Sequence, residues 1–169
     1  MENRAQRKHI RLKQYDYAEE GVYFITFCTK NRAPLLSHIV GRGALTPPQV
    51  ALTDIGKIVA EIIENTEKVY ANITVDNYVI MPNHVHVLIR ISEGNGGVRA
   101  PRPTVNEIIK GIKGLATRKI GFSIWQTGFY DHIIRDDEDY QIRFRYIEEN
   151  PARWPQDEYY QEVTNERHH

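Results

Sequence analysis

Two histidines separated by a single residue, His84 and His86, are the most distinctive chemical feature of the sequence. They lie in the run HVHVLIRI, whose β-branched residues are typical of a strand. Alternate side chains of a strand share a face, so both imidazoles point one way while Val85 and Val87 point the other way. Two adjacent imidazoles are suitable ligands for a divalent cation. The alternative is a structural pair, since a chain with seven histidines can contain this spacing by chance.

A tyrosine and an asparagine near the end of the last predicted helix form a second candidate. Tyr146 and Asn150 are four residues apart, so they lie side by side on a helix. At about 100° per residue, Tyr146 is displaced from the apolar stripe of that helix. The stripe consists of Tyr140, Phe144 and Ile147. Tyr146 and Asn150 could serve as nucleophile and metal ligand, or as a surface residue and a helix cap.

A third candidate is the aromatic and polar segment around residues 125–132. Trp125 could stack on unpaired bases of a nucleic acid, or it could fill the core. His132 and Gln126 are candidate neighbours of the histidine pair. For His132 this requires that its strand lies beside theirs, and a structural hydrogen bond is the alternative.

The elements that must position these residues follow a recognisable order. Gly41, Gly43, Pro47 and Pro48 predict a loop over residues 31–50. Strands are predicted at 22–28, 73–80, 84–91 and around 131–134. Three helices are predicted: one that begins at Leu52, one that follows a capping box of Thr104 and Glu107, and one over 136–149. The order matches the β-α-β-β-α-β motif of ferredoxin-like folds. We therefore expect an α+β fold, an antiparallel sheet with helices on one face, plus an added C-terminal helix that carries Tyr146.

Length and composition indicate one ordinary globular domain. The chain has 169 residues, of which 41% are hydrophobic and 26% charged. No apolar run approaches the roughly 18 residues of a membrane span, and the start does not resemble a secretory signal. The single cysteine, Cys28, excludes an internal disulfide and a cysteine-based zinc site. We expect a cytoplasmic protein with a basic arm (1–20), one domain (21–151) and a C-terminal tail (152–169).

Charge is segregated along the chain, although the net charge is zero and the pI is about 7.1. Basic residues concentrate in the arm and in residues 99–119, where a solvated polar face is the ordinary explanation. If the chain binds a nucleic acid, these segments are the candidates for phosphate contacts. The candidate residues are Arg4, Arg7, Lys8, Arg11, Lys13, Lys110, Lys113 and Arg118.

Three segments taken together resemble the single-tyrosine transposases of the HUH class. They are YVIMPNHVHVL (78–88), IWQTGFYDHIIR (124–135) and DYQIRFRYIEENP (139–151). Within that class the sequence is most similar to REP-associated tyrosine transposases and related insertion-sequence transposases. The resemblance extends over residues 20–151 and includes no motif from the tail.

The resemblance implies a function as well as a fold. It implies a small ferredoxin-like DNA-strand transferase and endonuclease that cuts single-stranded DNA beside a hairpin. His84, His86 and Asn150 would hold Mg²⁺ or Mn²⁺, and Tyr146 would be the nucleophile that forms a 5′-phosphotyrosine intermediate. Some relatives act as dimers that exchange the tyrosine helix and others act as monomers, so the choice between monomer and homodimer stays open.

Other functions are compatible with the same residues. One is a metal-dependent phosphodiesterase that activates water, with Tyr146 as a bystander. Another is a domesticated hairpin-DNA-binding protein without cleavage activity. A replication or conjugation nickase of the HUH class is a third, although such proteins are usually larger. The DNA target sequence, and whether the gene is mobile, are also left open.

Overall fold

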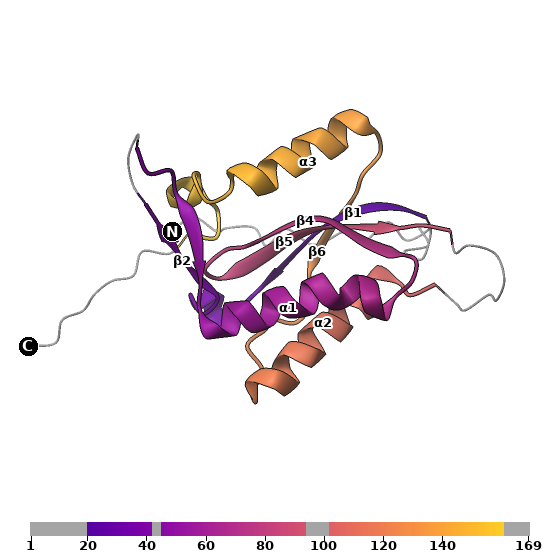
Figure 1. Cartoon of the computed structure of the whole chain (residues 1–169), viewed down its shortest axis with the longest axis horizontal. Helices are drawn as coiled ribbons and strands as arrows, with labels where there is room; N and C mark the ends of the chain where they lie inside the picture. The colour runs from indigo at the N-terminus through magenta and orange to yellow at the C-terminus, as the bar shows by residue number, and fades with distance from the viewer. Residues whose placement is uncertain (1–19, 42–44, 94–101, 161–169) are drawn as a thin grey trace, which may run out of the picture.

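A four-stranded antiparallel sheet in the order β4-β5-β1-β6 forms the centre of the computed structural model (Figure 1). The structure describes residues 20–41, 45–93 and 102–160. The strands are β1 (Gly21–Cys28), β4 (Ile73–Ile80), β5 (His84–Ile91) and β6 (Tyr130–Ile133). β5 pairs with β1 and β4 on its two sides, so it is an inner strand. The α+β class predicted from the sequence is confirmed, and so is the predicted order of elements, apart from two short strands within residues 37–52.

Two helices, α1 (Asp54–Val69) and α2 (Val105–Ile120), cover one face of the sheet (Figure 1). Both begin at a threonine whose side chain accepts a backbone hydrogen bond, Thr53 for α1 and Thr104 for α2. The predicted capping box of Thr104 and Glu107 is present. The main hydrophobic core lies between these helices and the sheet.

The third helix, α3 (Asp137–Glu149), lies on the opposite face, as Figure 1 shows. It covers a smaller apolar cluster, in which Ile147 is the buried contribution of the helix. Polar contacts also attach α3 to the sheet, because Tyr140 donates to Asp76 (3.0 Å) and His132 contacts Asp139 (2.8 Å). The side chains beneath α3 are those of the β4, β5 and β1 residues that face away from the main core.

A hairpin replaces the loop predicted for residues 31–50. Its strands are β2 (Ser37–Val40) and β3 (Gln49–Leu52), and the short 3₁₀ turn η1 (Lys30–Arg32) precedes it. The loop prediction is wrong because each strand has only four residues, too few to outweigh the glycine and proline signals nearby. Ser37 donates to the carbonyl of Ile80 (2.9 Å), which fixes the hairpin beside the β4–β5 turn. Because β3 ends at Leu52, α1 begins at Asp54 and not at Leu52 as predicted.

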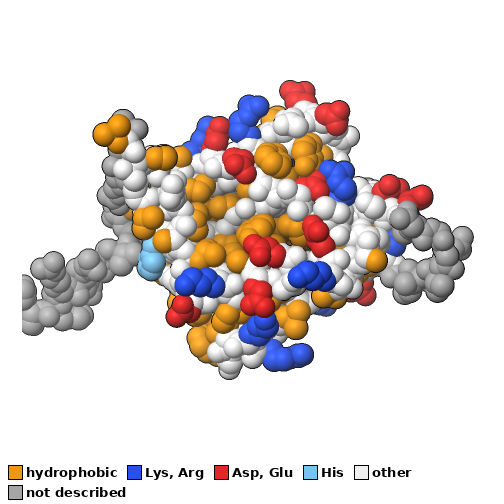
Figure 2. Space-filling model, viewed as in Figure 1, with side chains coloured by type: hydrophobic (Ala, Val, Ile, Leu, Met, Phe, Trp, Pro, Cys, Tyr) orange, Lys and Arg blue, Asp and Glu red, His pale blue; other side chains and the backbone are white. Residues whose placement is uncertain are grey.

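Acidic and basic side chains are interspersed on the face seen in Figure 2. Two of the ion pairs involving α1 are Lys57 with Asp54 and Lys119 with Glu61. This face therefore presents no extended field of one sign. The five basic candidates of the N-terminal arm lie outside the described residues.

None of the helices in the described ranges combines the length and the apolar character that a bilayer crossing requires.

Candidate active site

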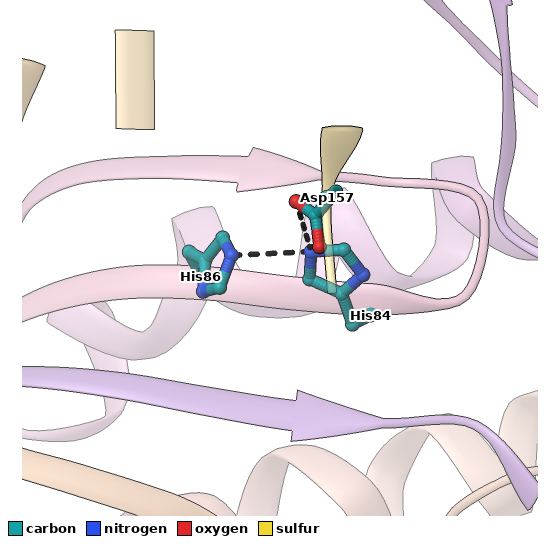
Figure 3. Close-up of side chains that lie close together, drawn as sticks. All are labelled: His84, His86 and Asp157. Carbon is teal, nitrogen blue, oxygen red and sulfur yellow. Dashed lines mark hydrogen bonds and ion pairs between the residues drawn. The ribbon is translucent and has the colours of Figure 1, made fainter. Parts of the chain in front are cut away.

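His84 and His86 lie at the start of β5, fully buried on the face that α3 covers. Their Nε2 atoms are 3.1 Å apart (Figure 3). Val85 and Val87 belong to the main core on the other face. The shared orientation of the two imidazoles, predicted from the period of a strand, is confirmed.

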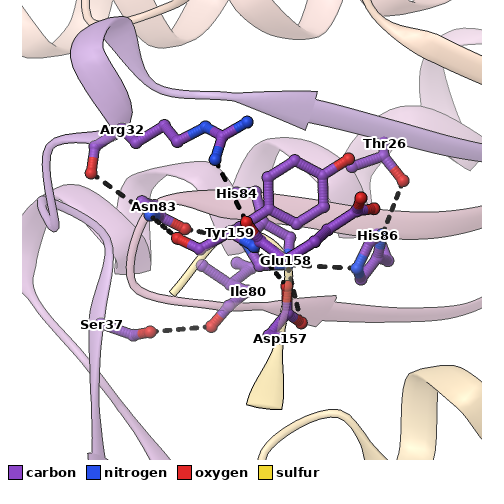
Figure 4. A network of polar contacts seen from close by, with 10 residues as sticks. All are labelled: Thr26, Arg32, Ser37, Ile80, Asn83, His84, His86, Asp157, Glu158 and Tyr159. Carbon is purple, nitrogen blue, oxygen red and sulfur yellow. Dashed lines mark hydrogen bonds and ion pairs between the residues drawn. The ribbon is translucent and has the colours of Figure 1, made fainter. Parts of the chain in front are cut away.

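The orientation of Asn83 fixes which nitrogen of His84 carries the proton. Asn83 Nδ2 donates to the carbonyl oxygens of Arg32 (3.2 Å) and Tyr159 (2.7 Å), as Figure 4 shows. Asn83 Oδ1 therefore accepts from His84 Nδ1 at 2.8 Å. The lone pair of His84 Nε2 is left directed toward His86, whose own Nδ1 lies 2.6 Å from Thr26 Oγ1. Such second partners orient imidazoles for metal binding.

Asp157 brings a carboxylate to the two imidazoles from beyond the predicted domain. Its Oδ2 lies 3.9 Å from His84 Nε2, and the ligand atoms of Asp157, His84 and His86 all lie within 4.8 Å of one another (Figure 3). The Asp157 side chain is only 2% exposed. It follows the short turn η2 (Trp154–Gln156), and the neighbouring rings of Trp154 and Tyr159 lie 5.9 and 4.4 Å from the His84 ring.

Sequence reasoning missed Asp157 because the tail carries no family motif. One signal was available, since WPQDEYY places a single acidic pair among three aromatic residues. Two of these aromatic residues, Trp154 and Tyr159, lie against the His84 ring, and Asp157 is between them in the sequence.

Asn150 ends α3 and is 2% exposed. It lies close enough to affect the pKa of His84, Tyr146 and Asp157. Its Oδ1 is buried and accepts no hydrogen bond from any residue that the structure describes. An orphaned oxygen beside two imidazoles and a carboxylate fits a bound cation.

Tyr146 lies on α3 above the histidines of its own chain. Its ring centroid is 5.2 Å from that of His86 and 5.9 Å from that of Phe24. Burial, reinforced by the charge of Asp157, raises the pKa of the half-buried Tyr146 phenol, so its hydroxyl is protonated at neutral pH. The structure thus brings Tyr146, His84, His86 and Asn150 together within one chain.

The other predicted site residues lie apart from this cluster. His132 is on β6 opposite Phe24 of β1, so Phe24 separates it from His86. Gln126 is exposed, and its carbonyl accepts from Lys113 at 2.9 Å. Trp125 is 5% exposed and packs edge-on against Phe27 in the main core, which supports the core-filling interpretation of this residue.

Burial keeps both histidines neutral, which metal binding requires. It lowers the pKa of His84 to about 3 and that of His86 well below its usual value of 6.5. In the unfolded chain they titrate near pH 6.5, so below that pH the unfolded state binds more protons. We expect the free energy of unfolding without metal to fall by about 1.4 kcal/mol per histidine between pH 7.5 and 5.5.

Urea unfolding in EDTA at the two pH values measures this effect. The variant carrying His84→Gln and His86→Gln should lose less stability on acidification than the wild type. His38→Gln, at an exposed position of β2, is the matched control and should behave as the wild type. Burial raises the pKa of Asp157, so at lower pH this carboxyl contributes an increase in the free energy of unfolding, opposite to the effect of the histidines. The same pH dependence in the wild type and the double variant would contradict the prediction.

Comparisons with known proteins identify a relative by sequence and a solved structure with the same fold. No protein-family profile matches the chain. An uncharacterized protein of Haemophilus influenzae is 37% identical over 173 residues, which cover 91% of this chain and 93% of that protein. Among solved structures, a REP-associated tyrosine transposase bound to a REP hairpin superposes with a TM-score of 0.61. That match has 22% sequence identity and covers 83% of this chain and 72% of the other chain.

Proposed function

We propose that this chain, which belongs to the same family as the Haemophilus influenzae protein and has the fold of a tyrosine transposase, is a DNA-strand transferase of the HUH class. Its activity would be the cutting and rejoining of single-stranded DNA at sites flanked by a hairpin. The observation that carries this proposal is the Tyr146 ring 5.2 Å from His86, above two facing imidazole nitrogens and a carboxylate. A nucleophile beside a group of metal-ligand side chains is what tyrosine-mediated strand cleavage needs.

In this proposal, Tyr146 Oη attacks the scissile phosphorus. A bond forms between Oη and phosphorus, the bond from phosphorus to the 3′ oxygen breaks, and the phenolic proton ends on that 3′ oxygen. The products are a 5′-phosphotyrosine and a free 3′-hydroxyl. The covalent intermediate retains the energy of the broken phosphodiester, so the reverse attack by a 3′-hydroxyl rejoins a strand.

His84 and His86 would hold a divalent cation through Nε2, with oxygen ligands from Asp157 and Asn150. When bound, the cation would supply Lewis-acid polarisation of the scissile phosphate. Two imidazoles suit a transition metal such as Mn²⁺ better than Mg²⁺, which prefers oxygen ligands. The domain predicted for residues 21–151 would then be completed by the segment that carries Asp157.

We assign further contacts with DNA phosphates to α2, which covers the face of the sheet opposite α3. Lys110 and Arg118 are exposed on this helix, and Lys110 lines a groove of about 570 Å³ between α2 and residues 123–129. Lys113 lines the same groove, and its Nζ donates to the carbonyls of Gln126 and Gly128, so it also holds that loop. The basic arm is the further candidate segment for DNA contacts.

Replacing both Lys110 and Arg118 with alanine should weaken binding to single-stranded hairpin DNA. Each lost phosphate contact should reduce the slope of log K against log salt by roughly one, because fewer counterions are released. Fluorescence anisotropy between 50 and 200 mM salt measures this slope. Lys57→Ala, on α1 beside Asp54, is the matched control. An unchanged slope would remove α2 from the interface.

Covalent trapping tests the proposed function as a whole. The full chain is incubated with Mn²⁺ and single-stranded hairpin DNA from the flanks of its own gene, and the products are separated on a denaturing gel. A shifted protein–DNA band that EDTA abolishes is the expected result. Cleavage without such a band would support a water-activating phosphodiesterase instead. Binding without cleavage would support a DNA-binding protein that has no strand-transfer activity.

A further inference from the structure

Arg143 lies one helical turn before Tyr146 on α3, so the two side chains are neighbours on the helix surface. Its guanidinium carbon is 5.1 Å from the centroid of the Phe24 ring. The same Phe24 ring stacks on His86 at 5.3 Å and meets Tyr146 edge-on at 5.9 Å. One aromatic ring is therefore in contact with the guanidinium, with the candidate nucleophile and with a candidate metal ligand.

The guanidinium of Arg143 is incompletely paired. Its Nε is buried and donates no hydrogen bond to any acceptor among the described residues. The acid beside it is Asp139, whose oxygen lies 3.7 Å from Nε. Both carboxylate oxygens of Asp139 already contact His132, at 2.8 and 3.0 Å. Because the Arg143 side chain is 28% exposed, its remaining donors can reach a ligand that enters the site.

The site needs a positive group for the substrate it is proposed to bind. A phosphodiester carries a negative charge that is redistributed onto its non-bridging oxygens as Tyr146 attacks, while Asp157 and Glu158 already place negative charge near the tyrosine. A guanidinium offers a planar fork of donors that matches two phosphate oxygens. Arg143 is the arginine of α3 that reaches this face, since Arg145 is exposed.

We propose that Arg143 is a catalytic residue that binds the non-bridging oxygens of the scissile phosphate during attack by Tyr146. This inference rests on the proposed strand-transfer function. Arg143 exchanges no proton in the step. The Oη–phosphorus bond forms, the bond from phosphorus to the 3′ oxygen breaks, and the phenolic proton ends on that 3′ oxygen. Throughout this step the guanidinium stabilises the negative charge on the non-bridging oxygens.

The alternative is a purely structural role, in which Arg143 holds α3 to the sheet through Phe24 and Asp139. Two substitutions separate the roles. Arg143→Lys keeps the charge but removes the fork, and Arg143→Met keeps much of the packing volume but removes the charge. Arg145→Met, an exposed position on the same helix, is the matched control.

Single-turnover cleavage of saturating hairpin DNA in Mn²⁺ is the experiment, performed with a normal strand and with a strand that carries a neutral methylphosphonate at the scissile position. On the normal strand, Arg143→Met should slow cleavage by roughly a hundredfold, the usual effect of losing one oxyanion donor, and Arg143→Lys should slow it less. On the methylphosphonate strand, the effect of Arg143→Met should shrink to a few-fold, because the guanidinium has lost its charged partner.

Equal slowing of the two strands by Arg143→Met would assign Arg143 a structural role and overturn the proposal. Wild-type rates in Arg143→Met would overturn it as well. If the wild type itself forms no adduct and cuts neither strand, the proposed function fails, and the role of Arg143 fails with it. Arg145→Met should retain the wild-type rate on the normal strand.

Discussion

Replacing Tyr146 with phenylalanine should abolish the covalent protein–DNA band and slow strand cleavage by roughly a thousandfold or more. The substitution removes only the hydroxyl oxygen that would attack phosphorus. The ring that contacts Phe24 and His86 is retained, so α3 should stay in place. Single-turnover reactions with Mn²⁺ and hairpin DNA, separated on a denaturing gel, give both the adduct and the cleavage rate.

Tyr140→Phe is the matched control for this experiment. Tyr140 is on the same helix, and its hydroxyl donates to Asp76 rather than facing the histidines. Its loss should leave the covalent band intact, at some cost in stability, because Asp76 then has one partner fewer. A band that survives in Tyr146→Phe would show that another tyrosine is the nucleophile, with Tyr140 or Tyr130 next to be tested.

Replacing His84 or His86 with glutamine should remove the stabilisation that Mn²⁺ gives to the wild type. A ligand at a hundred times its Kd stabilises the folded state by about 2.7 kcal/mol, which raises Tm by roughly 5–11 °C in a chain of this size. Thermal unfolding with and without Mn²⁺ measures this shift independently of DNA cleavage. Cleavage itself should fall by roughly a hundredfold or more, since a direct ligand matters at least as much as its outer-shell partners.

His38→Gln again serves as the control, and its Mn²⁺ shift should equal that of the wild type. Asp157→Asn and Asn150→Ala distinguish the two candidates for the remaining ligands. The ligand atoms of Asp157 and the histidines lie within 4.8 Å of one another, so we expect the larger loss of the Mn²⁺ shift from Asp157→Asn. A full Mn²⁺ shift in the glutamine variants of both His84 and His86 would exclude metal binding at these imidazoles.

The positions set by local periodicity could be predicted from the sequence. The two-residue period of a strand placed His84 and His86 on one face, and the capping box marked the start of α2. The order of elements was sufficient for the fold class. These predictions succeed because each depends on neighbours in the sequence, whose geometry a strand or a helix fixes.

The features that depend on contacts between distant residues could not be predicted in the same way. The β2–β3 hairpin is fixed in part by a hydrogen bond from Ser37 to Ile80, forty-three residues away. Asp157 reaches the histidines because Trp154 and Tyr159 pack against His84, which no local pattern in the tail indicates. Trp125 had two local interpretations, and only its contact with Phe27 in the core favours one of them.

The position of Asn83 has a consequence for recognising the same site in other chains. Its amide donates to two carbonyl groups while its oxygen accepts from His84, so both ends of the side chain are in use. Aspartate has nearly the same shape, but an ionised carboxylate would face those carbonyls without a hydrogen to donate. A chain with Asp-His-hydrophobe-His should therefore not be equated with this one. The asparagine is therefore as informative for a sequence comparison as the histidines.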